Sequence, residues 1–497
     1  MRLSELARDG PMVDMQGAPD TDIAGLACDS REVRPGFLFA ALPGARTDGA
    51  RFIDDAIRRG ARAVLGPPAE AARARAGRIA FIADANPRRR YALMAARFFP
   101  AQPATLVAVT GTNGKTSVAA FACALWRRLG RQAASLGTLG VDAPGLRRPG
   151  ALTTPDPVAL HRLLDDLARA GVDHAVIEAS SHGLAQHRCD GVRLVAAAFT
   201  NLTRDHLDYH GTEDTYFAAK ARLFAELLPA GAAAVLNRDS PRYPELAALC
   251  ARRGHRLVGY GRDAEAGDAP EIALIDSTAA PDGLALTLRI GRTRHRIDTR
   301  LVGGFQAHNL MCALALVIAC GEDAARAAAA AEGIAAPRGR LERVARLADG
   351  APIFVDYAHT PDALRAVLEA VRGHVQGRLH LVFGAGGDRD PGKRPQMGAV
   401  AAALADRVIV TDDNPRSEQP AAIRAAILAA APGAREIADR ALAIAEAVGA
   451  LRPGDALVIA GKGHETGQII GERTIPFDDA EVARAAVAAL AGGGDGA

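Results

Sequence analysis

The sequence predicts an α/β protein of three domains, in which parallel sheets are covered by helices. The chain has 497 residues, and at about 150 residues per domain this length suggests three domains. Short apolar runs of strand length alternate along the chain with helical patterns, the order that is typical of a parallel sheet. Several of these runs lead directly into glycine-rich or polar loops, where open α/β sheets bind their ligands.

The composition excludes several classes of protein. Hydrophobic residues make up 49% and charged residues 24%, the usual balance of a globular protein, and a net charge of +3 does not indicate a nucleic-acid-binding protein. Six scattered cysteines without a Cys-x-x-Cys pair argue against a disulfide framework or a thiolate metal site and favour a reducing compartment. The N-terminus is too charged for a signal peptide, and the longest apolar run, 310–319, is too short to span a membrane. We therefore expect a cytoplasmic protein that contacts neither nucleic acid nor membrane.

The first two domains are expected over residues 1–102 and 103–336. Prolines and three consecutive arginines between residues 83 and 104 are typical of a boundary, and the apolar run 106–109 then predicts a buried parallel strand. After a glycine loop, a helical pattern runs from 117 to 129 and stops at Gly130, a C-terminal cap signal. Further strands of the second domain are expected at three apolar runs: 175–177, 195–199 and 232–236.

A third domain is expected over residues 337–497, because Pro337 and Gly339 interrupt an alanine-rich helical pattern. Strands are predicted at 379–383, 407–410 and 456–459, and each runs into a polar or glycine-rich loop. These loops are residues 384–389, 412–416 and 461–465. Because the carboxyl ends of parallel strands lie at one edge of a sheet, the three loops predict one shared ligand site.

The strongest motif consists of six residues between a predicted strand and a predicted helix: Gly111, Thr112, Asn113, Gly114, Lys115 and Thr116. Backbone N–H groups and a helix N-terminus cradle phosphate in this context, with Lys115 reaching the terminal phosphates and the Thr116 hydroxyl on Mg²⁺. The usual phosphate loop has four residues between its glycine and the Gly-Lys pair, whereas only two separate Gly111 from Gly114. We predict a nucleotide site, against the alternative of a structural glycine turn.

Three further features belong to the second domain, and the first two follow predicted strands. Glu178 is placed to hold a metal ion, although a helix N-cap role beside Ser180 and Ser181 is the alternative interpretation. The segment 200–210 contains two histidines and two aspartates, a density that favours ligation or catalysis over structural roles. Lys220, taken by itself, is typical of a solvated helix lysine.

Together these motifs resemble the Mur ligase family. The matching stretches run from residues 29–31 to 461–465 and include 111–116, 178–188, 205–220, 356–362 and 413–416. The resemblance implies an N-terminal nucleotide-sugar domain, a central P-loop ATPase domain and a C-terminal Rossmann-like domain. It implies a ligase of peptidoglycan precursor synthesis that uses UDP-N-acetylmuramoyl-L-alanyl-D-glutamate, ATP and meso-diaminopimelate, with Mg²⁺ as cofactor. We expect it to be a monomer.

The resemblance also implies roles for individual residues. The catalytic residues would be Lys115, His206 and Lys220, and the Mg²⁺ ligands would be Thr116, Glu178, His206 and Lys220 as a carbamate. ATP would contact Gly111, Thr112, Asn113, Gly114, Lys115, Thr116, Ser117, Asn309 and Asp356, the last two at adenine and ribose. The UDP-linked dipeptide would contact Cys28, Ser30, Ala45, Arg46, Thr47, Thr153, Thr154, Ser180, Gln186 and Arg188. The incoming amino acid would contact Arg389, Asp413, Asn414, Pro415, Arg416, Gly461 and Glu465.

The choice of amino acid depends on residues 413–416. Without the resemblance, an Asn-Pro turn followed by a solvated arginine is the simpler interpretation. Family members that add meso-diaminopimelate have arginine at the Arg416 position, and those that add lysine generally do not. A guanidinium can bind the second carboxylate of meso-diaminopimelate with two parallel hydrogen bonds, and lysine has no such carboxylate.

Four alternatives stay open. A lysine-adding relative would generally lack arginine at the Arg416 position, and a folylpolyglutamate synthase-like ligase would lack the first domain and the 413–416 loop. A small-molecule P-loop kinase would leave the later motifs unused. A non-catalytic nucleotide-binding protein is disfavoured, because it needs no set of metal ligands such as Glu178, His206 and Lys220.

Overall fold

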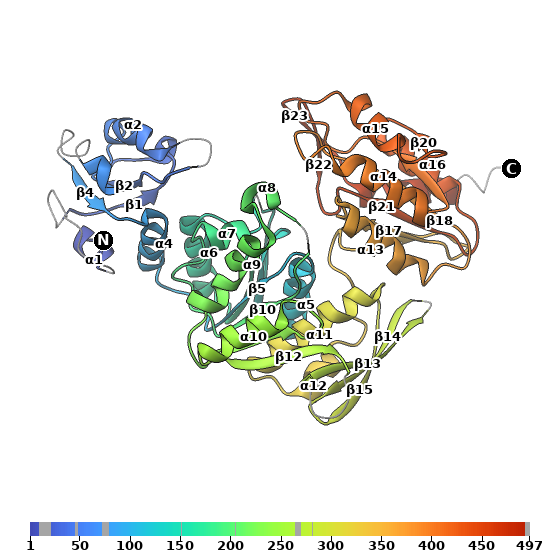
Figure 1. Cartoon of the computed structure of the whole chain (residues 1–497), viewed down its shortest axis with the longest axis horizontal. Helices are drawn as coiled ribbons and strands as arrows, with labels where there is room; N and C mark the ends of the chain where they lie inside the picture. The colour runs from blue at the N-terminus through green and yellow to red at the C-terminus, as the bar shows by residue number, and fades with distance from the viewer. Residues whose placement is uncertain are drawn as a thin grey trace. The chain divides into compact units, whose positions relative to one another are not determined.

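The computed structural model describes residues 1–8, 21–44, 48–71, 79–150, 152–203, 205–263, 270–280 and 282–492. The chain forms two compact units, Met1–Arg262 with Cys312–Ala327, and Asp263–Met311 with Ala328–Ala497. Sheets with helices packed against them occur in both units, the α/β architecture that the sequence predicts (Figure 1).

The first unit begins with a four-stranded parallel sheet in the order β1-β2-β3-β4. Its strands are Gly25–Ala27, Phe37–Ala40, Ala63–Gly66 and Ala80–Ala83, with helices α1 (Leu3–Leu6), α2 (Ile53–Arg58) and α4 (Pro87–Phe98). Short 3₁₀ turns lie at Ser30–Glu32, Gly49–Phe52 and Pro68–Glu70. Leu38 and Leu65 pack in one core and Phe39 and Val64 in another, so both faces of this sheet are buried.

The second sheet of this unit has the strand order β12-β11-β10-β5-β9-β6-β7-β8. Six strands from β12 to β6 are parallel, and β7 and β8 add an antiparallel edge. In chain order they are β5 (Thr105–Thr110), β6 (Ala133–Gly137), β7 (Gly140–Ala143), β8 (Leu146–Arg148), β9 (His174–Glu178), β10 (Ala196–Phe199), β11 (Ala233–Asn237) and β12 (Arg256–Arg262). The four strands predicted for this region are confirmed.

The helices around this sheet are α5 (Lys115–Arg128), α6 (Pro157–Arg169), α7 (Ser181–Ala185), α8 (Leu207–His210), α9 (Glu213–Arg222) and α10 (Tyr243–Arg252), with a π-helical turn at Leu223–Leu227. The predicted helix from 117 to 129 is α5, and Gly130 follows it with a φ of +87°. Strands β5, β9 and β10 are parallel neighbours, so the segments that follow Thr110, Glu178 and Phe199 lie at the same edge of the sheet. That edge contains the phosphate loop and both polar segments picked out in the sequence.

The second unit contains an antiparallel ribbon and a six-stranded sheet. The ribbon consists of β13 (Ile272–Ala280), β14 (Gly283–Ile290) and β15 (Thr293–Thr299). The sheet has the order β16-β17-β21-β18-β19-β20, and its strands are β16 (Glu342–Arg346), β17 (Pro352–Asp356), β18 (Leu379–Phe383), β19 (Arg407–Val410), β20 (Arg435–Glu436) and β21 (Ala456–Ala460). The sheet is mixed, because β16 pairs antiparallel with β17.

Helices α13 (Pro361–Arg372), α14 (Lys393–Leu404), α15 (Pro420–Leu428), α16 (Arg440–Gly449) and α17 (Asp479–Gly492) accompany this sheet, and β22 (Gly467–Ile470) and β23 (Arg473–Pro476) form a hairpin. Elsewhere in the chain lie α11 (Gly304–Ala319) and α12 (Ala324–Ala330). The apolar run 310–319 is therefore part of a largely buried helix. Among the helices within the described ranges, none has the length and apolar character needed to cross a bilayer.

Candidate active site

The phosphate loop is held in place by the segment that follows β10. The Thr112 N–H donates to the Asn201 carbonyl at 2.9 Å, and the Asn113 N–H donates to the Asn201 side-chain oxygen at 3.0 Å. The Thr200 hydroxyl donates to the Asn113 carbonyl at 2.6 Å. A Cβ at Gly111 would lie 1.9 Å from this hydroxyl, so only glycine permits the close approach.

Two lysines meet at this loop. The Lys115 ammonium donates to the carbonyls of Gly111 and Thr112, both at 2.9 Å. Lys220 is 1% exposed, donates to the same Gly111 carbonyl at 2.7 Å and lies 4.3 Å from the centre of the Tyr216 ring. Burial, reinforced by the charge of Lys115, lowers the pKa of Lys220 far below its usual range. The interpretation of Lys220 as a solvated helix lysine is therefore wrong.

Glu178 points at the first turn of α5. One of its oxygens, Oε2, accepts from the Thr116 hydroxyl at 2.9 Å, and the other accepts from the Thr138 N–H at 2.9 Å. The helix N-cap role belongs to Ser180, which caps α7, so the alternative interpretation of Glu178 is wrong. A Cβ at Gly137 would lie 2.0 Å from Glu178 Oε1, the oxygen that accepts from Thr138. A hydroxyl and a buried carboxylate at a phosphate loop are the oxygen donors that suit Mg²⁺.

His206 belongs to a cluster of aromatic rings. Its ring centre lies 4.9 Å from that of His182, which in turn lies 4.2 Å from that of Tyr209. The ring centre of His206 also lies 6.1 Å from that of Tyr216, the residue whose ring adjoins Lys220. Desolvation, followed by the charges of nearby histidines, lowers the pKa of His182 to about 4, and desolvation also lowers the pKa of His206. Neutral imidazoles are able to accept a proton or ligate a metal ion.

The four predicted metal ligands are thus arranged as two pairs. Contacts join Thr116 to Glu178, and His206 and Lys220 both adjoin the Tyr216 ring. Within the ranges that the structure describes, no three His, Cys, Asp or Glu side chains converge as a preformed metal site. The pair of Thr116 and Glu178 fits a Mg²⁺ ion best by its chemistry.

The predicted dipeptide-binding residues of the central region form one hydrogen-bonded network. The Arg188 guanidinium donates to the Thr154 carbonyl and to the Gln186 side-chain oxygen, both at 2.7 Å. The hydroxyls of Thr154 and Ser180 are 3.0 Å apart, and that of Thr153 is 3.0 Å from the Thr138 hydroxyl. Burial lowers the pKa of Arg188, and none of the described carboxylates forms an ion pair with it. Such an arginine suits a carboxylate ligand.

The predicted uridine-binding residues are described only in part. Cys28 is exposed and Ser30 is buried, and both follow β1. Ala45, Arg46 and Thr47 lie outside the described residues. All six cysteines are free, in agreement with the absence of a disulfide framework.

The predicted adenine and ribose contacts are linked within the second unit. The Asn309 amide donates to the Gln306 side-chain oxygen at 3.0 Å, and the Gln306 amide donates to the Arg340 carbonyl at 3.1 Å. The Arg340 guanidinium lies 4.7 Å from the centre of the Tyr357 ring. Burial raises the pKa of Asp356 to about 6, an effect that the charge of Arg340 opposes. Arg340 therefore connects the two predicted positions.

The loops after β18, β19 and β21 meet at Asn414, as expected for neighbouring parallel strands. The Asn414 amide donates to Glu465 at 2.8 Å, and its side-chain oxygen accepts from the Lys462 ammonium at 2.9 Å. The Gly387 N–H donates to the Asn414 carbonyl at 2.9 Å. Asn414 is 4% exposed, so the Asn-Pro sequence here is an internal junction between loops.

Arg416 is anchored by its main chain. Its N–H donates to the Ile469 carbonyl at 3.0 Å, and its carbonyl accepts from the Gly471 N–H at 2.7 Å. Its guanidinium donates to the Gly387 carbonyl at 2.7 Å, and its φ of +52° lies in the left-handed region that disfavours side chains. The interpretation as a freely solvated turn residue is therefore wrong. Backbone strain of this kind is frequent at ligand-binding positions.

The other predicted amino-acid-binding residues surround this junction. Asp413 and Pro415 are buried, and Arg389 is exposed in the loop after β18. Gly461 has a φ of +114°, and a Cβ there would lie 2.8 Å from an Asp413 carboxylate oxygen. The Gly461 position therefore allows the loop after β21 to approach Asp413.

Several residues contribute contacts at these sites that the sequence did not predict. Asn201 and Lys462 lie inside motifs that were identified, but their contacts link segments far apart in the chain and carry no local signal. Tyr216 and His182 are identified only by the rings that they pack against. Arg340 lies in a stretch where Pro337 and Gly339 indicate only a domain boundary.

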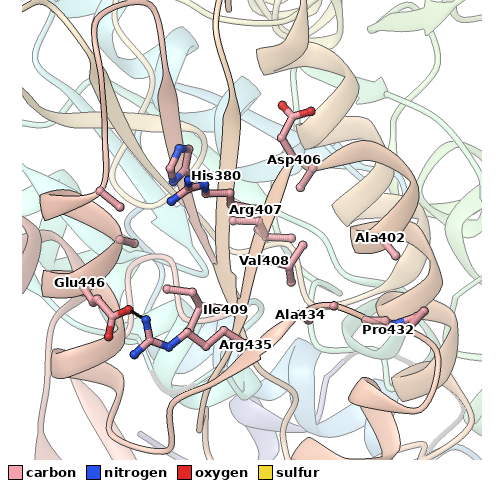
Figure 2. Close-up of a pocket in the computed structure, with 16 residues that line it drawn as sticks. His380, Ala402, Asp406, Arg407, Val408, Ile409, Pro432, Ala434, Arg435 and Glu446 are labelled. Atoms are coloured by element: carbon pink, nitrogen blue, oxygen red, sulfur yellow. Dashed lines mark hydrogen bonds and ion pairs between the residues drawn. The ribbon is translucent and has the colours of Figure 1, made fainter.

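A separate cavity of about 450 Å³ lies in the second unit. His380, Arg407 and Val408 line it near the amino ends of β18 and β19, the opposite end from the loops that meet at Asn414. Figure 2 shows Arg435 and Glu446 paired across part of its wall. The lining includes none of the predicted site residues, so this cavity is distinct from the candidate active site.

Comparison with known sequence families accounts for most of the chain. The Mur ligase family, catalytic domain matches residues 22–99, the Mur ligase middle domain matches residues 109–317, and the Mur ligase, glutamate ligase domain matches residues 339–463. Two relatives named UDP-N-acetylmuramoyl-L-alanyl-D-glutamate–2,6-diaminopimelate ligase are similar over nearly their whole length. That of Bradyrhizobium diazoefficiens is 54% identical over 94% of this chain and 95% of the relative, and that of Caulobacter vibrioides is 51% identical over 93% and 95%.

Solved structures of two related proteins have folds similar to that of this chain. A structure of a protein of the same name matches with a TM-score of 0.72 and 31% identity, covering 99% of each chain. A Mycobacterium tuberculosis folylpolyglutamate synthase shares the fold at a TM-score of 0.60 and 22% identity, over 75% of this chain and 92% of that one. With three family domains matched in order and relatives about half identical along the chain, this protein belongs to the Mur ligase family.

Proposed function

We propose that this protein is the ATP-dependent ligase that joins meso-diaminopimelate to the D-glutamate carboxylate of UDP-N-acetylmuramoyl-L-alanyl-D-glutamate, in the synthesis of peptidoglycan precursors. The observation that carries the proposal is its similarity to relatives of that name over nearly the whole chain. The anchored Arg416 supports the choice of amino acid, because its guanidinium lies where the loops after three neighbouring strands meet. The folylpolyglutamate synthase alternative is disfavoured, since the first domain and the 413–416 loop are both present.

The chemistry needs an activated carboxylate, because hydroxide is a poor leaving group. Transfer of the γ-phosphoryl group of ATP to a carboxylate oxygen gives an acyl phosphate and ADP. The amine then attacks the acyl carbon, and the tetrahedral intermediate collapses with loss of phosphate and of one amine proton. Lys115 and the N–H groups of the phosphate loop would stabilise the negative charge on the transferred group.

Mg²⁺ would be held by Thr116 and Glu178, with His206 and a carbamate on Lys220 as further ligands. The metal ion would offset the charge of the phosphates when bound. The carbamate forms when the neutral amine of Lys220 adds CO₂ and releases one proton. Burial of Lys220 beside a second ammonium, that of Lys115, supports this assignment, because the pocket disfavours two cations.

The remaining assignments follow the same division of the chain. Asn309 and Asp356 would contact adenine and ribose, and the network around Arg188 would hold the muramoyl dipeptide through a carboxylate. Cys28, Ser30 and residues 45–47 would contact the uridine nucleotide. We propose that the chain has three domains, 1–102, 103–336 and 337–497. We also propose that the protein is a monomer that works in the cytoplasm on small-molecule substrates.

A phosphate-release assay tests the proposal. The protein is incubated with the UDP-linked dipeptide, ATP, Mg²⁺ and one amino acid from a panel, with Lys115→Ala as the inactive control. Release should require every component and should be fastest with meso-diaminopimelate. Faster release with L-lysine would indicate the lysine-adding relative, and a stable phosphorylated product without any amine would indicate a kinase. Either result would refute the assignment.

A further inference from the structure

The chain contains four lysines among its 60 basic residues, and the remaining basic residues are all arginine. Two of the lysines, Lys115 and Lys220, contact the phosphate loop. A third, Lys462, lies in the second unit at the junction of the loops after β19 and β21. Three of the four lysines therefore lie at predicted ligand-binding segments.

Lys462 is fully buried beside two carboxylates and an amide oxygen. Its ammonium donates to the Asn414 side-chain oxygen at 2.9 Å and lies 3.5 Å from a carboxylate oxygen of both Asp413 and Glu465. One cation thus ties together residues that belong to two loops. The flanking Gly461 and Gly463 both have positive φ, and a Cβ at Gly463 would lie 2.7 Å from Tyr357. Both glycines therefore allow the backbone beside Lys462 to approach neighbouring residues closely.

The Asp413 carboxylate depends on this ammonium. Its Oδ1 is buried and accepts no hydrogen bond from the described residues. Two other cations act on Asp413 from farther away: Arg440, which is paired with Asp479, and Lys393, which donates to the His359 carbonyl. Lys462 is therefore the cation at ion-pair distance from Asp413, and without it the junction would have one more uncompensated negative charge.

We propose that Lys462 is a specificity-determining residue: its charge sets the electrostatic balance of the amino-acid site and so disfavours substrates with a surplus positive charge. This inference rests on the proposed function. L-lysine carries a net charge of one more than meso-diaminopimelate, because it lacks the second carboxylate. Removal of the Lys462 ammonium makes the site more negative by one charge. A more negative site favours L-lysine over meso-diaminopimelate, so the enzyme's preference for meso-diaminopimelate should decrease.

The test compares Lys462→Met and Lys462→Gln with the unmutated protein. The quantity measured is the ratio of kcat/KM for meso-diaminopimelate to kcat/KM for L-lysine, at saturating ATP and UDP-linked dipeptide. Both variants should lower this ratio by about tenfold or more, because both remove the charge. Glutamine can still donate to Asn414, so it separates loss of charge from loss of the hydrogen bond and serves where the methionine variant does not fold. Melting curves establish that each variant is folded.

Arg407→Met is the matched control. It removes one cation from an exposed position at the start of β19, in the wall of the separate cavity, and should leave the ratio unchanged. A parent-like ratio in a folded Lys462→Gln protein would overturn the inference and assign Lys462 a structural role. Absence of meso-diaminopimelate-dependent phosphate release from the unmutated protein would instead refute the proposed function itself.

Discussion

Lys115 and Lys220 donate hydrogen bonds to one acceptor, the carbonyl oxygen of Gly111, at 2.9 and 2.7 Å. Two ammonium groups on one carbonyl repel each other, and the buried Lys220 is the one whose pKa is driven down. The arrangement favours a neutral Lys220 amine, the form that reacts with CO₂. The contact therefore links the nucleotide loop to the predicted carbamate.

Lys220→Ala should reduce phosphate release by about a thousandfold, because it removes an anionic ligand expected at the metal site. A short carboxylic acid in the buffer should restore part of the activity by supplying the missing anion. Depletion of CO₂ and bicarbonate should slow the unmutated protein but not the rescued variant. Full activity of a folded Lys220→Ala protein would contradict the carbamate assignment.

Gly137→Ala should impair Mg²⁺ use without unfolding the protein. The added Cβ would lie 2.0 Å from Glu178 Oε1, so the carboxylate must shift from the position in which its Oε2 accepts from Thr116. We expect the Mg²⁺ concentration for half-maximal activity to rise about tenfold. Gly449→Ala is the control, because a Cβ there meets nothing within 4 Å. An unchanged Mg²⁺ requirement would show that Glu178 does not act through the metal.

The unmutated protein should prefer meso-diaminopimelate to L-lysine by at least about a hundredfold in kcat/KM, or about 2.7 kcal/mol. Arg416→Ala should lose most of this preference with less effect on the KM for ATP, because the guanidinium is the group proposed to bind the second carboxylate. Arg416→Lys keeps the charge but not the paired hydrogen bonds, and should recover only part of the preference. Equal use of the two amino acids by the unmutated protein would refute the role of Arg416.

Asp356→Asn should stabilise the protein at neutral pH while lowering its activity. Burial raises the pKa of Asp356 from its usual 3.8 to about 6, so the folded protein binds this proton more tightly than the unfolded chain. Stability therefore falls as the pH rises from 3.8 to about 6, by up to about 3 kcal/mol, and the loss is complete above that range. The melting temperature of the variant should exceed that of the parent at pH 7.5, and the difference should disappear near pH 4. A difference that does not vary with pH would contradict this account.

Seven of the parallel strands were predicted because each contains a continuous apolar run, whereas β6, β12 and β17, which are also parallel, were not predicted. The predicted bounds 379–383 and 407–410 match β18 and β19 to the residue. By contrast, β13 to β15 were not predicted: fully buried and partly buried residues alternate along most of β14, and Ile297 is the one apolar residue of β15, so neither is a continuous apolar run. The antiparallel pairing of β16 likewise has no local signal, because strand direction is decided by partners far along the chain.

The candidate site was predictable where it depends on a local motif and unpredictable where it depends on burial. The phosphate loop is identified by its glycines and its position between strand and helix. The burial of Lys220 is not, because its helix has the composition of an exposed one and only the tertiary fold covers it. The family resemblance implied that Lys220 is a metal ligand, whereas the local sequence pattern alone indicated a solvated helix lysine.

Main-chain hydrogen bonds to Ile469 and Gly471 hold the loop at Arg416 independently of the arginine side chain, whose guanidinium adds one hydrogen bond, to the Gly387 carbonyl. Any residue that tolerates the left-handed conformation can therefore occupy this position while the loop keeps its course, and asparagine or glycine would do so with less strain. Choice of amino acid is thereby separated from folding. A library of substitutions at this single position would explore new amine substrates on an unchanged scaffold, and a lineage of such enzymes could exchange one amino-acid substrate for another without losing the fold.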